Sequence, residues 1–139
     1  MEKKRKARIL IAEDEAHIRS LIALIVVSLG AEVVAEASDG EQALSLYQQL
    51  RPDMVILDIN MPKLDGISVL KKIMAIDPRT LVVMLTSLNA LDVVKECIDS
   101  GAWNYILKNT TAEELNKAIS ATWGEYMAEI KAARTVAKS

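Results

Sequence analysis

Residues 54–58 read Met-Val-Ile-Leu-Asp, and this stretch decides the fold. Four consecutive apolar residues predict a strand buried on both faces, which is typical of a parallel sheet covered by helices on either side. The strand ends in a carboxylate, Asp58, at the end where open parallel sheets bind their ligands. The segments on either side therefore have to supply further parallel strands and the helices that cover them.

Four more segments have the composition of strands, and they alternate with helical patterns. We predict strands at 9–12, 32–35, 81–85 and 105–107. Helices are predicted at about 18–29, from a capping box at Ser38 and Glu41 through 50, at 66–76, at 90–100, and after Thr110 or Thr111. Because strands that alternate with helices pair in parallel through crossovers, we expect an α/β domain with a doubly wound, five-stranded parallel sheet.

The composition is that of one globular domain: 139 residues, 51% of them hydrophobic and 26% charged. The longest apolar run, 21–27, has seven residues and is too short to span a membrane. The basic start lacks the apolar region of a signal peptide, so we expect a cytoplasmic protein. Residues 1–8 carry a net charge of +4, the last nine residues +3, and the 122 residues between them −9. This acidic body argues against direct binding of nucleic acid.

Polar residues follow four of the five predicted strands, and the carboxyl ends of parallel strands meet at one edge of the sheet. They are Glu13-Asp14-Glu15, Asp58, Thr86-Ser87 and Lys108. Crowded carboxylates repel one another, and Mg²⁺, which prefers oxygen ligands, relieves that repulsion. A lysine and a hydroxyl suit the oxygens of a phosphoryl group. Ordinary solvent-facing strand ends are the alternative, but the agreement of four strand ends favours a phosphoryl-transfer site with Asp58 as nucleophile.

The sequence resembles the receiver domains of two-component response regulators. The resemblance rests on Glu13-Asp14, Asp58, Met61-Pro62, Asp65-Gly66, Thr86 and Lys108. It covers residues 7–125, and its layout is similar to that of single-domain chemotaxis-type regulators. It implies a flavodoxin-like (βα)5 fold, with a basic tail over residues 1–6 and a helical extension or tail over residues 126–139.

The resemblance implies a phosphoacceptor and a metal site. Asp58 would accept a phosphoryl group from a histidine kinase, a histidine phosphotransfer protein or a small phosphodonor. Asp14, Asp58 and the backbone carbonyl of Asn60 would bind Mg²⁺ directly, and Glu13 would act through water. The chain would then catalyse at most its own phosphorylation and dephosphorylation.

The resemblance also implies a switch. Thr86, Ser87 and Lys108 would contact the phosphoryl group, with Ser87 small enough to leave access open. Thr86 would move toward the phosphoryl group, and Tyr105 would fill the space that it leaves. This coupled change would alter the surface of the fourth helix, fifth strand and fifth helix, where a downstream protein binds.

The residue after Lys108 departs from the family pattern, which usually has proline there, often in a cis peptide. A cis bond before a non-proline residue costs about 2.5–4 kcal/mol, so we expect a trans bond between Lys108 and Asn109. A rerouted loop would then leave Lys108 less well placed. The departure keeps open the alternative of a protein-binding module that works without phosphorylation.

Two further questions stay open in the sequence. A haloacid-dehalogenase-type phosphatase also uses an Asp nucleophile, Lys and Mg²⁺, but it needs a second Asp where this chain has Asn60.

The last helix is longer than a receiver needs, and Gly124 argues against one straight helix. The alternatives for this extension are a linker to an output domain, a helix that forms a homodimer, and a frayed tail.

Overall fold

The computed structural model describes residues 6–87 and 91–138, with side chains as far as Ala132. Within these residues five strands alternate with five helices. The strands are β1 (Arg8–Ala12), β2 (Glu32–Ala37), β3 (Met54–Asp58), β4 (Leu81–Thr86) and β5 (Asn104–Leu107). The helices are α1 (Ala16–Ser28), α2 (Gly40–Leu50), α3 (Gly66–Ile76), α4 (Leu91–Asp99) and α5 (Ala112–Lys138).

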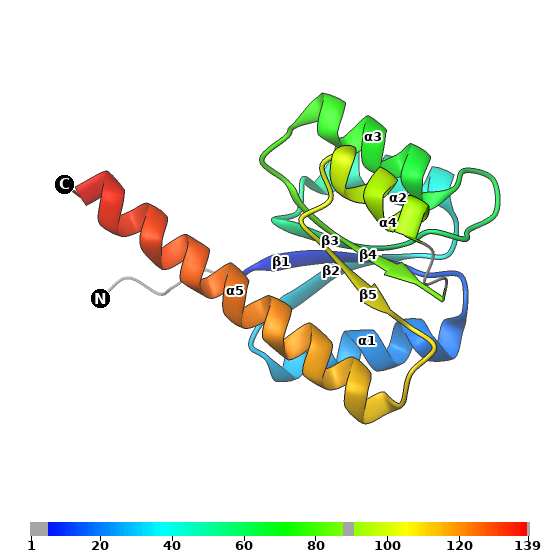
Figure 1. Ribbon diagram of the computed structural model, residues 1–139, viewed down its shortest axis with the longest axis horizontal. Helices are drawn as coiled ribbons and strands as arrows, with labels where there is room; N and C mark the ends of the chain where they lie inside the picture. The colour runs from blue at the N-terminus through cyan, green and yellow to red at the C-terminus, as the bar shows by residue number, and fades with distance from the viewer. Residues whose placement is uncertain (1–5, 88–90, 139) are drawn as a thin grey trace.

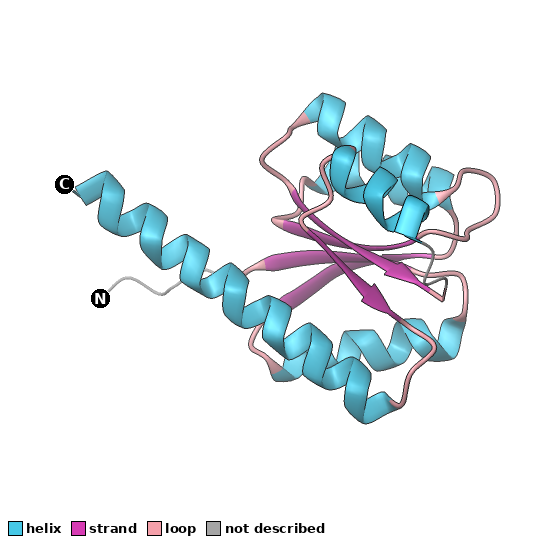
Figure 2. Ribbon diagram, viewed as in Figure 1, coloured by secondary structure: helices cyan, strands magenta, loops and turns pink. Residues whose placement is uncertain are grey.

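All neighbouring strands pair in parallel, in the order β2-β1-β3-β4-β5. The sheet forms the middle layer of a three-layer molecule (Figure 1). Helices α1 and α5 cover one face, and α2, α3 and α4 cover the other (Figure 2). The predicted doubly wound α/β fold is confirmed.

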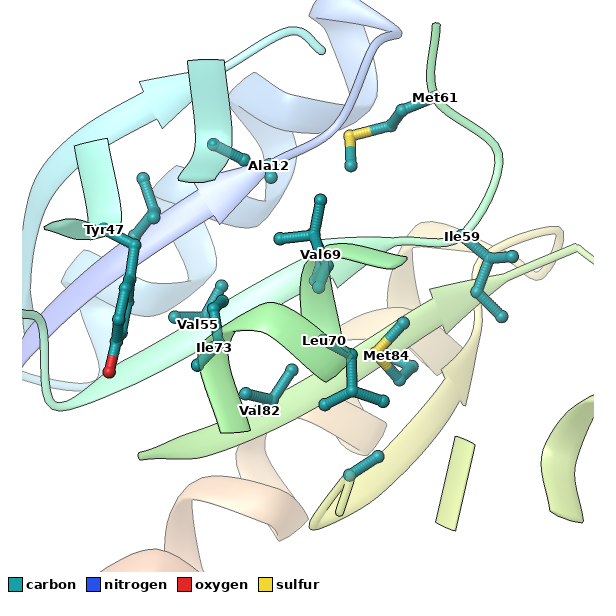
Figure 3. Packing of buried hydrophobic residues seen from close by; sticks show 14 of the residues in the cluster. Ala12, Tyr47, Val55, Ile59, Met61, Val69, Leu70, Ile73, Val82 and Met84 are labelled. Carbon is teal, nitrogen blue, oxygen red and sulfur yellow. The ribbon is translucent and has the colours of Figure 1, made fainter. Parts of the chain in front are cut away.

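Two apolar cores lie on the two faces of the sheet. Figure 3 shows the one beneath α2 and α3, in which Val55, Val82 and Met84 of the sheet pack against Leu70 and other helical residues. The second core joins alternate sheet residues to α1 and α5. Every residue of β3 is buried, which explains its uninterrupted apolar sequence. A fully buried side chain of this size contributes about 1.5–3 kcal/mol, so the cores hold the strand ends firmly in register.

Side-chain caps fix the starts of α2, α3 and α5, and one of them differs from the prediction. Asp39, not Ser38, is the N-cap of α2, and its carboxylate accepts a hydrogen bond from the Gln42 N–H at 2.8 Å. The Gln42 side chain in turn accepts from the N–H of Ser38, the residue before the cap, so the N-cap lies one residue later than predicted. Of the two caps considered for α5, Thr111 is used, since its hydroxyl accepts from the Glu114 N–H.

Helix α5 runs unbroken through Gly124, contrary to the expectation from its sequence. The cost of one helical glycine, about 1 kcal/mol, is offset because Tyr126 is buried in the second core and Trp123 and Ile130 pack against it. Figure 1 shows the last turns of α5 projecting beyond the sheet. The division at residue 125 stays a prediction, and residues 1–5 of the predicted basic tail lie outside the described residues. In the part of the chain that is described, no helix is long and apolar enough to cross a membrane.

Candidate functional site

The carboxyl ends of β1, β3, β4 and β5 bring the predicted site residues together. Glu13 follows β1, Asp58 ends β3, Thr86 ends β4 and Lys108 follows β5. Backbone pairing continues past β5, because the Lys108 N–H donates to the Thr86 carbonyl at 2.9 Å. The lysine is therefore held in register with the sheet rather than carried on a free loop.

The amino group of Lys108 lies at the centre of the site and contacts three carboxylates. Its Nζ is 3.0 Å from Glu13 Oε1, 3.0 Å from Asp58 Oδ2 and 3.3 Å from Glu15 Oε1. The Lys108 side chain is 8% exposed, and those of Glu13 and Asp58 are fully buried. An ammonium group has three N–H donors, so each carboxylate can take one of them.

Backbone groups hold the carboxylates in place. Glu13 Oε2 accepts a hydrogen bond from the Glu15 N–H at 2.8 Å, and Asp58 Oδ1 accepts from the Asn60 N–H at 3.3 Å. The guanidinium of Arg19 on α1 donates to the Glu13 carbonyl at 2.7 Å. These bonds fix the two buried acids independently of Lys108.

The burial of Asp58 dominates its electrostatics. Loss of solvent raises the pKa of Asp58 to about 7. Lys108 opposes this rise through a hydrogen bond and its charge, while the charge of Glu13 and a hydrogen bond with Asp14 add to it. For Lys108, burial alone would lower the pKa, but hydrogen bonds to Asp58 and Glu13 outweigh it and the pKa is raised. Partial burial also opposes ionisation of Asp14, yet hydrogen bonds with the Glu13 and Asp58 carboxyl groups hold its pKa below the usual value.

Glu13, Asp14 and Asp58 form a group suited to a divalent cation. One oxygen from each lies within 4.8 Å of the others. The donor set is all oxygen, and the single lysine does not balance the acids, which is the environment that Mg²⁺ prefers. The residues therefore fit the predicted metal. Asn60 lines the adjoining pocket, and the role of its carbonyl as a ligand stays a prediction.

A pocket of about 350 Å³ opens from this group to solvent. Asn60, Ser87, Lys108 and Asn109 line it, together with residues at the start of α1. Ser87 is exposed at its edge, consistent with the expected open access.

The bond between Lys108 and Asn109 is trans, as expected. Both ends of Lys108 are held, because its N–H pairs with β4 and its Nζ makes three ion pairs. The effect of Asn109 on the placement of Lys108 stays a prediction.

Thr86 and Tyr105 share one face of the sheet. Tyr105 is paired with Met84 and Leu107 with Thr86, and Met84 and Thr86 are two residues apart on β4, so all four point to the same side. Thr86 is buried, whereas Tyr105 is half-buried. Tyr105 packs against the core beneath α2 and α3 and lines a groove between β5 and α5. The placement suits the predicted coupling, and the movement itself stays a prediction.

Glu15 is a site residue that the sequence reasoning missed. The sequence places Glu15 in the acidic run after the first strand, but it does not predict the contact with Lys108. The signal was present in the run Glu13-Asp14-Glu15, since a residue at the start of a helix beside a strand end faces the same pocket.

Comparison with known proteins agrees with this geometry. Residues 9–120 match the model of the response regulator receiver domain. The chain is 41% identical to the chemotaxis protein CheY of Bacillus subtilis over 115 residues, which cover 83% of this chain and 96% of that protein. It is 40% identical to the transcriptional regulatory protein PdtaR of Mycobacterium tuberculosis, where the match covers 81% of this chain but 54% of the longer regulator.

A solved structure gives the same result. The CheX-CheY-BeF3-Mg²⁺ complex from Borrelia burgdorferi contains a chain that is 31% identical, with a TM-score of 0.77, over 84% of this chain and 89% of that one. Both the fold and the sequence match. The chain therefore belongs to the family of response regulator receiver domains of two-component signalling.

Proposed function

We propose that this chain is a phosphoacceptor of a two-component phosphorelay and that Asp58 is the residue phosphorylated. The observation that carries the proposal is the contact of 3.0 Å between Lys108 Nζ and a fully buried Asp58 carboxylate that shares its site with two more acids. The similarity to a chain whose solved complex holds beryllofluoride and Mg²⁺ supports it.

The chemistry needs a carboxylate nucleophile and a cation for the phosphoryl oxygens. An oxygen of Asp58 attacks the phosphorus of the donor, and the bond to the leaving group breaks with its electron pair leaving on that group. The product is an acyl phosphate on Asp58. Lys108 is positioned to donate to an oxygen of the transferred group.

Mg²⁺, when bound, supplies the positive charge that offsets the carboxylates and the incoming phosphoryl oxygens. Asp14, Asp58 and the Asn60 carbonyl would be its direct ligands, and Glu13 would act through water. Glu13 also keeps its contacts with Lys108, so it orients the lysine as well as adding charge.

Phosphorylation would be transmitted through Thr86 and Tyr105 to the surface of α4, β5 and α5. A local charge event biases a two-state element only through contacts that differ between the states. A hydrogen bond from the Thr86 hydroxyl to the phosphoryl group is such a contact, and Tyr105 lies on the same face of the sheet. We propose a histidine kinase or histidine phosphotransfer protein as the upstream partner and a protein as the downstream one.

We propose no turnover of external substrates beyond the chain's own phosphorylation and dephosphorylation. A phosphatase of the haloacid-dehalogenase type is disfavoured because Asn60 offers no carboxyl group two residues after the nucleophile.

The test is incubation with acetyl phosphate and Mg²⁺, read by intact-protein mass spectrometry. We expect one added phosphoryl group in the wild type, none in Asp58→Ala and none when Mg²⁺ is chelated. An unmodified wild type, or an equally modified Asp58→Ala, would overturn the proposal. If the chain is modified but binds its partner equally well with and without phosphodonor, the phosphorylation-independent module is the correct reading.

A further inference from the structure

The loop after β3 carries Asn60, and the residues on either side of Asn60 are anchored in the protein. Ile59 and Met61 are both buried in the core beneath α2 and α3 (Figure 3). The Ile59 N–H also donates to the Leu85 carbonyl of β4 at 3.0 Å. Asn60 itself is exposed and lines the pocket of the site. The position of its backbone carbonyl, the predicted metal ligand, therefore depends on where its neighbours are held.

The next turn of this loop is strained. The Leu64 N–H donates to the Pro62 carbonyl at 2.8 Å, which closes a three-residue turn with Lys63 at its centre. Lys63 has a φ of 71°, a conformation that residues other than glycine rarely adopt. Strain of this kind persists only where the surrounding structure enforces it, and it is concentrated at functional sites.

The start of α2 holds this turn in place. The Gly40 N–H donates to the Pro62 carbonyl at 3.3 Å, and an Asp39 carboxylate oxygen lies 3.6 Å from the Lys63 amino group. A Cβ on Gly40 would overlap the carbonyl group of Leu64, so only glycine lets the helix approach the turn this closely. Gly40 is buried and does not line the pocket of the site.

We propose that Gly40 is a positioning residue for the Mg²⁺ site: it lets the start of α2 dock on the turn at 62–64, and this contact holds the Asn60 carbonyl in place for the metal. The inference rests on the proposed function of the same site. It gives α2, a helix that contributes no residue to the pocket, a part in the affinity for Mg²⁺.

The variant Gly40→Ala tests this in a titration with Mg²⁺ alone, followed through the amide NMR signals of Asp58 and Asn60. The added methyl group forces the start of α2 and the turn apart. Loss of a group that orients a metal ligand typically weakens metal binding by about 10- to 100-fold, and we expect a loss of about 10-fold here.

The matched control is Gly101→Ala, which lies before β5, at the opposite end of the sheet from the site. Gly101 has a φ of 106°, and a Cβ there would crowd the Met74 side chain, so this alanine should also destabilise the fold. It should leave the Mg²⁺ affinity unchanged. Thermal unfolding establishes a temperature at which both variants are folded during the titration.

Hydrogen exchange in the wild type gives a second measurement that needs no variant. If release of the contact between α2 and the turn costs the site its metal, Mg²⁺ at ten times its dissociation constant should slow exchange of the Gly40 N–H by about 10-fold. The Ala102 N–H, which donates to the Cys97 carbonyl at 2.9 Å beside the control glycine, should exchange at the same rate with and without Mg²⁺.

The outcomes separate this inference from the proposed function. If the wild type binds no Mg²⁺, the proposed function fails at its metal site. If the wild type binds Mg²⁺ but Gly40→Ala binds it equally well, or Gly101→Ala loses as much affinity, the inference alone is overturned. If Gly40→Ala does not fold, hydrogen exchange decides: an unchanged rate at Gly40, or an equal slowing at Ala102, overturns the inference.

Discussion

Burial of Asp58 disfavours the ionised carboxylate that its proposed role as a nucleophile requires. Its side chain is fully buried and its pKa is raised to about 7, chiefly because burial removes solvent from the charge. In the unfolded chain its pKa would be 3.8, the ordinary value for an aspartate. Between these two pKa values the folded protein therefore keeps a proton that the unfolded chain releases. Ionising Asp58 in the folded protein costs stability, and a bound cation or phosphorylation can relieve that cost.

The sign of this linkage gives a prediction for the metal-free protein. Below about pH 4 both states are protonated and Asp58 contributes nothing. As the pH rises from about 4 to 7 the free energy of unfolding falls, and above 7 the penalty is constant. Asp58→Asn should therefore stabilise the protein at pH 8 by on the order of 3 kcal/mol, and much less at pH 5. Urea unfolding at the two pH values measures this.

The control for that experiment is Asp99→Asn, because the Asp99 side chain is 66% exposed on α4. It should change the unfolding free energy little at either pH. A gain from Asp58→Asn that is equal at pH 5 and pH 8 would contradict the account of a burial-raised pKa.

At the scale of elements, the start of α3 is packed directly against the end of β3. A Cβ on Gly66 would fall inside contact distance of the Asp58 carbonyl oxygen, and the Gly66 N–H donates to the Ile59 carbonyl at 2.8 Å. The glycine lets the helix begin close enough to hold the strand end that carries Asp58.

Gly66→Ala should therefore destabilise the protein by more than 1 kcal/mol and lower the yield of phosphorylated Asp58, since backbone has to move at both elements. Gly124→Ala is the matched substitution, with nothing within 4 Å of its Cβ and a helical backbone, and should stabilise by about 0.5–1 kcal/mol. Thermal unfolding compares them. A neutral Gly66→Ala would show that the close approach is not a constraint.

Much of the fold and of the site could be predicted from the sequence patterns of the individual strands and helices. The apolar runs predicted the five strands, and the predicted span of the third helix matches Gly66–Ile76. The polar residues at the strand ends converge because parallel strands share a carboxyl edge. The shift of the α2 cap to Asp39 could not be predicted, since Ser38 and Asp39 are both good caps and tertiary geometry chooses between them.

The contacts of Lys108 could not be predicted either. The position of the Lys108 side chain depends on the hydrogen bond from its backbone N–H to the Thr86 carbonyl, which no sequence pattern indicates. Its contact with Glu15 depends on where α1 begins. A long last helix is predicted, but its continuity through Gly124 is not, because the cost of Gly124 is local whereas the burial of Tyr126 is tertiary.

At the scale of the whole molecule, α5 joins the core to a projecting helix. Tyr126 is buried and Ile130 packs against the second core, so the core extends along α5 past residue 125. The turns beyond Ile130 extend away from the sheet (Figure 1).

Truncation separates the two parts of α5. A chain that ends at Lys131 should keep the unfolding free energy of the full protein to within about 0.5 kcal/mol. A chain that ends at Gly124 loses Tyr126 and Ile130 and should be destabilised by about 2–4 kcal/mol. Chemical unfolding of both measures the difference. Equal stability of the two truncated chains would place the end of the folded core at residue 125 instead.

The charge distribution of the whole chain also has an explanation in the site. Part of the acidic excess between the two basic ends is concentrated in Glu13, Asp14 and Asp58, around the amino group of Lys108. The near-neutral total therefore conceals a site of opposed charges at one edge of the sheet.

The most direct test of the central claim, that modification of Asp58 is read out through Thr86 and Tyr105, is an amide NMR spectrum with and without beryllofluoride and Mg²⁺. We predict shifts at Asp58, Thr86 and Tyr105 and along β5 in the wild type, and none of these in Asp58→Ala with Mg²⁺ and beryllofluoride. Shifts confined to the immediate neighbours of Asp58, with Tyr105 and β5 unchanged, would contradict the coupling, and an unchanged wild-type spectrum would contradict the phosphoacceptor site itself.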